Sequence, residues 1–566
     1  MNRNSQAHFA TTPTVDISRS KFDRSFTHKT TFNAGDLIPF YVDSTILPGD
    51  TVKMNTAMVV RMMTPITPVM DNAEIDTYFF FCPYRLVWDH WNEFMGENKT
   101  APWAQTVEYE IPQVVAPTGG WTKGSLADYM GIPTEVDGFK ASALPFRAYS
   151  LIWNEWFRDQ NLKNPLYISM GDADTNGVDI LDQNYDPVTD TECGAAPVKA
   201  AKMHDLFTSC LPEAQKGPAV NLPLGNMAPV VYEKPDNYPN PQYTFPTGFE
   251  DEKVNLSINS SSGLNIGTDT NPVIAMGTLK SVSLAADLSQ AVGATVNQLR
   301  QAFQIQKFYE KQALYGTRYI EMIKGHFGVT NPDFRMQRPE YLGGMRQPIN
   351  INQVVQTDAT SQQVVYDAQT GWSMKDLSPQ GNTAAYSLTS WKNKDLFTHS
   401  FTEHGILMGL AVVRQTHTYQ QGLNRMFSQK KFYDFYFPEF ANLGNQPIYN
   451  KEIYLQSDSV VDTDGSVVND QVFGYQEAWA NYRYMPDIVT GEMRSNYSQS
   501  LDIWHWADDY SQLPSLGSDW IDETDENIER TLAVQNHDQF MGDFFFSAVY
   551  TRPMPLYSVP GLIDHH

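Results

Sequence analysis

Cysteine is scarce in this chain of 566 residues, and long apolar runs are absent. The three cysteines, Cys82, Cys193 and Cys210, are too few for a disulfide framework and have no metal-ligand spacing. They fit a reducing cytoplasm. The chain starts without a hydrophobic signal segment, and no apolar run approaches the length of a membrane span. We therefore expect a soluble protein made in a cytoplasm.

Signatures of catalysis are also missing. The chain has no Gly-rich phosphate loop, no Gly-x-Ser-x-Gly elbow and no His-Glu-x-x-His motif. His404 and His417 flank one apolar segment and are the histidines best placed to share a metal, although a structural role is the commoner one. The acidic residues of 519–529 suit either Ca²⁺ or the start of a helix, and their spacing matches no known calcium loop. We predict no enzyme and assign no catalytic residue, cofactor or metal site.

The proportion of charged residues is low for a chain of this size. Only 19% of the residues are charged, aromatics reach 13%, and the net charge is −25. Few charges with many aromatic residues indicate extensive burial, either inside a large monomer or against copies of the same chain. The acidity argues against nucleic-acid binding over the whole surface, because phosphates need lysine and arginine to replace their counterions.

The N-terminal segment departs from this acidity. Residues 1–35 hold five basic side chains and two acidic ones. A basic arm on an acidic body is typical of a segment that touches DNA, and an ordinary disordered tail is the alternative. The candidates for DNA contact are Arg3, Arg19, Lys21, Arg24 and Lys29.

Strand patterns dominate the ordered parts of the chain. Residues 41–45, 54–63 and 75–81 are rich in β-branched and aromatic residues, and a Pro-Gly turn at 47–50 separates the first two. Residues 405–415 form the most apolar strand and should lie in the core. Strands this far apart in sequence favour a mainly β, loop-rich protein.

Helical periods and a long insertion interrupt these strands. Residues 88–95, 144–162 and 295–319 have helical spacing of their apolar residues. Residues 226–285 have loop-like composition and indicate an insertion. The segments 432–440 and 551–557 are candidates for subunit interfaces, and the prolines of the second fit an edge strand or a packing arm.

Several tryptophans come in close pairs. Paired tryptophans stack sugars or bases in some proteins and fill cores or interfaces in most, so both interpretations stay open here. The pairs are Trp88 and Trp91, Trp153 and Trp156, and Trp504 and Trp506, the last pair on one face of an expected strand.

Long colinear blocks of this sequence resemble one family. They include FNAGDLIPFYVDSTILPGDTVKMNTAMVVRMM from residue 32, LPFRAYSLIWNEWFRDQNL at 144–162, HFGVTNPDFRMQRPEYLGG at 326–344 and TEHGILMGLAVVRQTHTYQQGLNRMFS at 402–428. These blocks are similar to the major capsid proteins of the gokushoviruses, tailless phages of the Microviridae. The main departures fall at roughly 165–290, where the family also varies.

The resemblance implies a viral eight-stranded antiparallel jelly-roll β-barrel with long loop insertions and a few helices. It divides the chain into a basic arm at 1–30 and a capsid domain at 31–566, interrupted by a variable insertion at about 226–285. It implies a T=1 icosahedral shell around a circular single-stranded DNA genome, assembled in the cytoplasm of a bacterial host.

The resemblance also implies the partners of the chain. They are further copies of itself, the genome, a small basic DNA-binding protein, a pilot protein, an internal scaffolding protein and a bacterial surface receptor. The insertion would form a protrusion at the three-fold axes and serve in host attachment. Its candidate residues are Tyr238, Tyr243, Phe245, Phe249 and Asn265. The alternative function is a carbohydrate-active or lectin-like β-sandwich protein.

Overall fold

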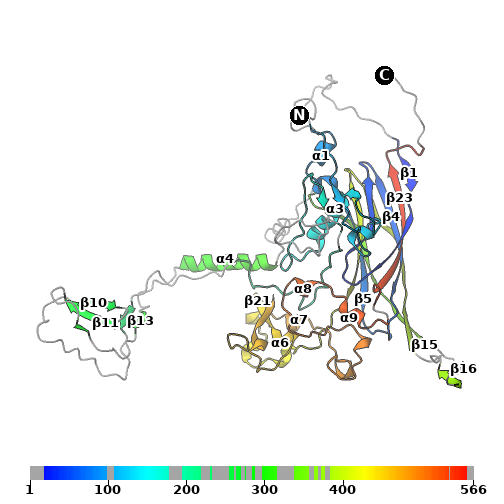
Figure 1. Cartoon of the computed structure of the whole chain (residues 1–566). Coiled ribbons are helices and arrows are strands. Elements are labelled where there is room, and N and C mark those ends of the chain that lie inside the picture. Colours follow the sequence, from blue (N-terminus) through cyan, green and yellow to red (C-terminus); the bar gives the residue numbers. More distant parts are fainter. Residues whose placement is uncertain are drawn as a thin grey trace, which may run out of the picture. The chain divides into compact units, whose positions relative to one another are not determined.

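Two antiparallel sheets form the centre of the structure, a computed structural model. It describes residues 18–97, 107–176, 194, 196–217, 230–232, 254–259, 263–268, 274–275, 284–286, 296–314, 337–355, 362–367, 371–376, 383–533 and 536–557. The β23 sheet has the order β1 (Ser20–Asp23) and β2 (Phe26–Phe32), β23 (Phe540–Arg552), β4 (Thr51–Met62) and β19 (Thr389–Ser400). The β20 sheet has the order β14 (Glu340–Pro348), β5 (Ala73–Pro83), β20 (Gly405–Gln415) and β3 (Ile38–Ile46) (Figure 1).

The pairing of these strands is nested along the chain. Strands β1 and β2 together line β23, so the first strand position pairs with the last. The second strand position, β3, pairs with the seventh, β20. The third, β4, pairs with the sixth, β19, and the fourth, β5, pairs with the fifth, β14. Nested antiparallel pairs divided between two sheets are the jelly-roll arrangement, so the predicted mainly β fold class is confirmed.

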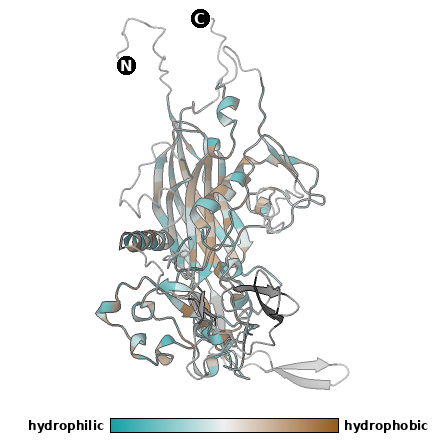
Figure 2. Ribbon diagram, turned by 90° about the vertical axis from the view of Figure 1, so that its left-hand side faces the viewer, coloured by the Kyte–Doolittle hydropathy of each residue, from teal (hydrophilic) through white to brown (hydrophobic). Residues whose placement is uncertain are grey.

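The two sheets differ in how many of their faces are covered. Every second residue of β4 is buried, whereas β20 is buried along almost its entire length. One apolar core, which includes Phe40, Phe79 and Phe544, lies between the sheets. A second core joins the other face of the β20 sheet, through Phe80 and Met408, to α3 (Leu144–Ile152). Figure 2 shows apolar residues concentrated along these strands.

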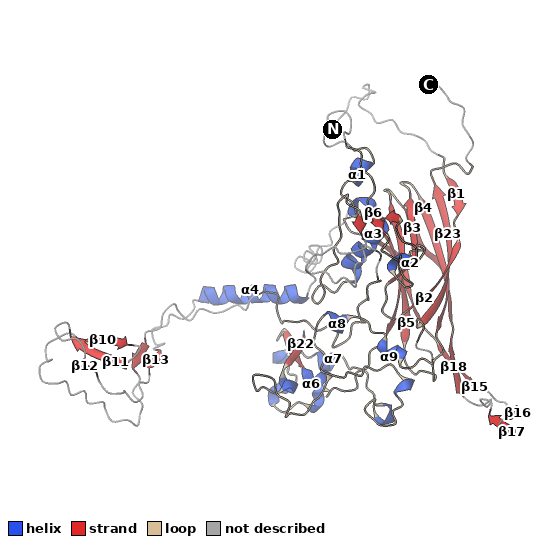
Figure 3. Cartoon of the chain, in the orientation of Figure 1, coloured by secondary structure: helices blue, strands red, loops and turns tan. Residues whose placement is uncertain are grey.

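Short elements surround the sheets. The helices are α1 (Trp91–Phe94), α2 (Leu126–Tyr129), α6 (Asn450–Ile453), α7 (Ala480–Arg483), α8 (Ser518–Ile521) and α9 (Glu526–Glu529). The smaller sheets pair β6 (Gln113–Val115) with β7 (Lys140–Ser142) and β8 (Thr175–Asn176), β15 (Ile351–Val355) with β18 (Thr383–Ser387), β16 (Gln362–Asp367) with β17 (Gly371–Asp376), and β21 (Asn445–Tyr449) with β22 (Val472–Glu477). Helices α1 and α3 lie on the β20-sheet side (Figure 3).

Residues 215–315 form a separate compact unit. It holds a sheet of β10 (Val254–Asn259), β11 (Gly263–Thr268) and β12 (Ile274–Ala275), the pair β9 (Val230–Tyr232) and β13 (Leu284–Ala286), and α4 (Val296–Leu314). The helix predicted at 295–319 is confirmed over 296–314, and the rest of that prediction lies outside the described residues. The loop-like interpretation of 226–285 is wrong where this segment forms strands. Apolar residues do alternate with polar ones in β10 (VNLSIN), but the run is short and lies among Gly, Asn and Ser residues that favour turns.

Two other local predictions are corrected. The helix predicted over 144–162 continues α3 as one π-helical turn, Trp153–Phe157, and ends there. The edge-strand alternative for residues 551–557 is wrong, because Thr551 and Arg552 end β23, which lies between β1/β2 and β4. Pro553 and Pro555 follow the last paired residue, because proline has no backbone N–H to donate to a sheet.

Candidate functional site

Exposed aromatic and apolar side chains gather on two segments, residues 425–443 and 479–485. Tyr433 is 71% exposed, and Phe427 and Met485 are each 70% exposed. We call the exposed set the aromatic surface; it comprises Met426, Phe427, Phe432, Tyr433, Phe435, Tyr436, Leu443, Tyr482, Tyr484 and Met485.

Ring contacts hold the aromatic surface together. Phe432 stacks on Phe437 with centroids 4.6 Å apart. Tyr436 lies 5.6 Å from the ring of Trp479 and 6.2 Å from that of Tyr482, which joins the two segments. Such pairs contribute about 0.5–1.5 kcal/mol each beyond their buried area. The exposed rings are therefore held in place before any partner arrives, which lowers the entropy cost of binding.

Trp479 anchors this surface from beneath. Its side chain is buried, and its indole N–H donates to the carbonyl of Phe440 over 2.9 Å. Its backbone has the left-handed conformation, with φ of 64°, immediately before α7. The bond ties the second segment to the end of the first.

A buried ion pair supports the start of the first segment. Arg425 Nη2 lies 2.7 Å from Glu452 Oε1, and the Glu452 side chain is 5% exposed. Gly422 packs directly against the backbone of Glu452, because a Cβ added to Gly422 would lie 1.9 Å from the Glu452 carbonyl oxygen. A glycine is therefore required at position 422.

The chemistry of the aromatic surface is that of a protein contact. Exposed apolar patches of this kind mark interaction sites, and the centres of protein interfaces are enriched in Tyr, Phe and Met. The candidate interface segment 432–440 lies in it, and its contact with a neighbouring copy stays a prediction. Among the described residues no group of three or more His, Cys, Asp or Glu side chains is placed to hold a metal ion.

His417 has a structural environment. Its Nδ1 lies 3.0 Å from Asp508 Oδ2 and its Nε2 lies 3.1 Å from Glu523 Oε1, all three side chains being buried. Burial alone would lower the pKa of His417, but the carboxylates of Glu523 and Asp508 raise it to about 9. Burial opposes the ionisation of Asp508, and His417 nevertheless lowers the pKa of Asp508 to about 2.

The acidic cluster at 519–529 is divided among several partners. Asp525 and Glu526 lie at the start of α9, as expected for a helix start. Asp522 instead pairs with Lys163, and Glu523 is buried against His417. The prediction of a solvated helix start is wrong for these two residues, because Glu523 is fully buried and Asp522 is partly buried beside Lys163.

The paired tryptophans mostly fill cores. Trp88, Trp153 and Trp506 are buried, and the indole N–H of Trp506 donates to Thr531 Oγ1 over 3.1 Å. Trp156 is 38% exposed. The expected strand at Trp504 is instead a 3₁₀ turn, Asp502–Trp504.

The candidates for DNA contact occupy different environments. Arg3 lies outside the described residues, and Arg19 is exposed. Lys21 and Lys29 are exposed on β1 and β2. Arg24 contacts Asp43, with Nη1 2.5 Å from Oδ2, and lies 4.8 Å from the centre of the Tyr550 ring. Arg24 therefore contributes to the sheet structure.

The protrusion candidates fall in the unit of residues 215–315. Asn265 lies on β11, opposite Ser257 of β10. Tyr238, Tyr243, Phe245 and Phe249 lie outside the described residues.

The jelly roll and its aromatic surface define a class of protein: a structural subunit with a surface suited to contact with protein. A model of the phage capsid protein (F protein) family matches residues 10–562. The chain therefore belongs to this family of capsid proteins.

Curated relatives agree over nearly the full chain. The capsid protein VP1 of Bdellovibrio phage phiMH2K is 42% identical, covering 99% of this chain and 98% of the relative. The capsid protein VP1 of Chlamydia phage 1 is 40% identical, covering 98% and 97%. The capsid protein VP1 of Spiroplasma virus 4 is 40% identical, covering 96% of each chain.

These comparisons confirm the resemblance to gokushovirus capsid proteins. The protein is a major capsid protein of a Microviridae-like phage and belongs in the virion capsid. Its role is structural and not enzymatic, because the relatives are named capsid proteins. No helix in the described part of the chain is long and apolar enough to cross a membrane.

Proposed function

We propose that the chain assembles into a T=1 icosahedral shell that encloses a circular single-stranded DNA genome. The observation that carries this proposal is the aromatic surface, whose largest rings stay open to solvent in one chain. Neighbouring copies would cover these rings. Each copy in a closed shell makes several contacts at once, so individually weak contacts suffice.

Single substitutions test the role of the aromatic surface. Phe432→Ser should reduce the yield of closed particles, measured by light scattering and negative-stain electron microscopy. Phe303→Ser on α4 is a matched control, because Phe303 is 63% exposed and Phe432 is 65% exposed. Assembly should be tested with the internal scaffolding protein of the same phage co-expressed. Uniform shells at wild-type yield from Phe432→Ser would refute the role of this surface.

The proposal extends to the other components of the virion. A small basic DNA-binding protein and a pilot protein would share the particle with the genome. The chain's net charge of −25 supports a separate basic protein, because an acidic shell neutralises little phosphate. Mass spectrometry of purified particles tests this part, and particles that hold full-length genome with neither protein would contradict it.

For host attachment, we propose the insertion at about 226–285 as a three-fold protrusion that meets a bacterial receptor. Support comes from its place within a compact unit of its own, since such units vary without disturbing the main fold. Replacing 226–285 by a short Gly-Ser linker should leave shells intact and abolish adsorption to host cells. Adsorption at the wild-type rate would exclude this role.

A further inference from the structure

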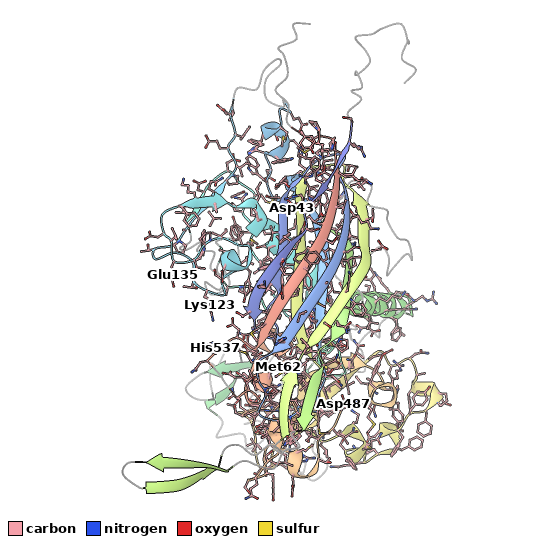
Figure 4. The ribbon with its side chains drawn as sticks, turned by 90° about the vertical axis from the view of Figure 1, so that its right-hand side faces the viewer. Asp43, Met62, Lys123, Glu135, Asp487 and His537 are labelled. Carbon is pink, nitrogen blue, oxygen red and sulfur yellow. The ribbon has the colours of Figure 1, made fainter. Side chains whose placement is uncertain are left out.

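The outward face of the β23 sheet is uncovered in the single chain. Buried and more accessible residues alternate along β4 and β23, so each strand contributes one set of side chains to the core and one to this face. Figure 4 looks onto the face, and no helix crosses in front of the strands. An antiparallel sheet with one open face is stable by itself in water, so the open face is free to bind a ligand.

Positive charge is concentrated on this face. The whole chain has 40 lysines and arginines against 65 aspartates and glutamates. Among the side chains that the structure describes on this face, five are cations and three are carboxylates. The five cations are Lys21, Lys29, Lys53, Arg61 and Lys392. The three carboxylates are Asp23, Asp395 and Asp543.

Two of these carboxylates already form ion pairs with lysines. Lys53 lies 2.5 Å from Asp395, and Lys29 lies 4.0 Å from Asp543. Within the described residues, Lys21, Arg61 and Lys392 form no ion pair with a carboxylate. The face therefore has cations available for phosphate, on a chain that is otherwise strongly acidic.

A phenylalanine lies in the middle of the face. Phe545 is 43% exposed, and its cross-strand neighbours are Thr27 on β2 and Ala57 on β4. Both neighbours are small, so the ring is accessible from above. Toward one end of the same strands lies a hollow of about 780 Å³, lined by Lys29 and Arg61 and also by the carboxylates of Asp128 and Asp543.

We propose that this face binds single-stranded DNA, with Lys21, Arg61 and Lys392 on phosphates and Phe545 stacked on a base. Sheets that present exposed aromatic rings between cations are a recurrent surface for single strands, because every base has a flat face to stack. A protein neighbour fits less well, because lysine is depleted at protein interfaces and the aromatic surface lies on other segments. The inference rests on the proposed enclosure of a genome and identifies where the chain would contact it.

Binding of the full-length protein to a fluorescein-labelled 20-nucleotide oligo(dT) tests the charged contacts. Anisotropy titrations at several salt concentrations give the slope of log affinity against log salt. Each phosphate contact on a single strand contributes about 0.7 to that slope. Arg61→Gln with Lys392→Gln should lower the slope by about 1.4. Arg300→Gln with Lys307→Gln, exposed on α4, is the charge-matched control and should leave it unchanged.

A second variant tests the ring. Phe545→Leu keeps an apolar side chain but removes the stacking surface, so affinity should fall about five-fold or more with the salt slope unchanged. The urea unfolding midpoint of each variant should match that of the wild type, because these side chains face solvent. Affinity of Phe545→Leu equal to the wild type would overturn the stacking contact.

Three results separate the failure of this inference from the failure of the proposed function. If Arg61→Gln with Lys392→Gln keeps the wild-type salt slope while shells still hold DNA, the face is not the contact and genome enclosure stands. Deleting residues 1–17 removes Arg3 but leaves β1 and β2 intact, and loss of binding only in that variant would assign the contact to the terminal segment. Wild-type shells without nucleic acid would instead refute the proposed function.

Discussion

The hydroxyl groups of Tyr41 and Tyr550 lie 2.6 Å apart in the interior between the two sheets, although 509 residues separate them in sequence. Tyr550 also donates to Asp43 Oδ2 over 2.6 Å, and Arg24 pairs with the same oxygen. Burial raises the pKa of Tyr41 to about 12, so its phenol keeps its proton at physiological pH. This network joins β3 and β23 to the turn between β1 and β2.

Removing one hydroxyl from this network should destabilise the protein. Tyr550→Phe removes one donor from the buried Asp43 carboxylate, which keeps those of Arg24 and Thr45, and removes the partner of the Tyr41 hydroxyl. The expected cost is about 1–3 kcal/mol in the free energy of unfolding. Urea denaturation followed by tryptophan fluorescence measures the change. Tyr433→Phe, at a 71% exposed tyrosine, is the control and should be neutral. Equal midpoints for the two variants would show that the network contributes nothing.

Stability should fall at alkaline pH because of His417. Its pKa is about 9 in the folded chain and 6.5 for an ordinary histidine. The stabilisation from its protonated form is therefore complete below pH 6.5 and is lost as the pH rises through 9. The loss is on the order of 3 kcal/mol. Unfolding midpoints measured from pH 6 to pH 9.5 should show it.

Variants at two histidines assign this pH dependence. His417→Gln should lower stability at pH 6 and flatten the decline toward pH 9.5, because Asp508 and Glu523 lose their buried cation. His204→Gln, at an exposed histidine, should keep the wild-type decline. An undiminished alkaline decline in His417→Gln would assign the effect to other groups.

A methyl group at position 422 should disrupt the support of the aromatic surface. Gly422→Ala places a Cβ against the Glu452 carbonyl oxygen, where a shift of the backbone is required. Overpacking of this kind costs about 1–3 kcal/mol. We expect a lower thermal midpoint and fewer particles. Gly517→Ala is the matched control, because nothing lies within 4 Å of the added carbon. A wild-type midpoint for Gly422→Ala would mean that the contact relaxes freely.

The indole N–H of Trp479 should matter for assembly. Trp479→Phe keeps a buried ring but removes the bond to the Phe440 carbonyl, a loss of about 1 kcal/mol. The exposed rings of 432–440 should then be more mobile, and particle yield should fall more than monomer stability does. Light scattering gives the yield and urea denaturation gives the stability. A parallel fall in both would indicate a purely structural role.

Local patterns determined the strands with strong periods. The alternation in β4 and the continuous apolar run of β20 are set by whether one or both faces of a sheet are covered, and both are visible in the residues themselves. The helical period that became α4 is equally local. The aromatic residues of 432–440 also indicated a contact surface, because their density is unusual whatever the fold.

Tertiary structure alone decided which distant segments meet. The polar N-terminal segment contains β1 and β2, which pair with β23 at the opposite end of the chain. His417 meets Asp508 and Glu523 across 91 and 106 residues. A local sequence pattern does not indicate such partners, because nested strand pairing and the burial of charged groups depend on the packing of the whole core. For the same reason the open, basic face of the β23 sheet emerges only when its five strands lie side by side.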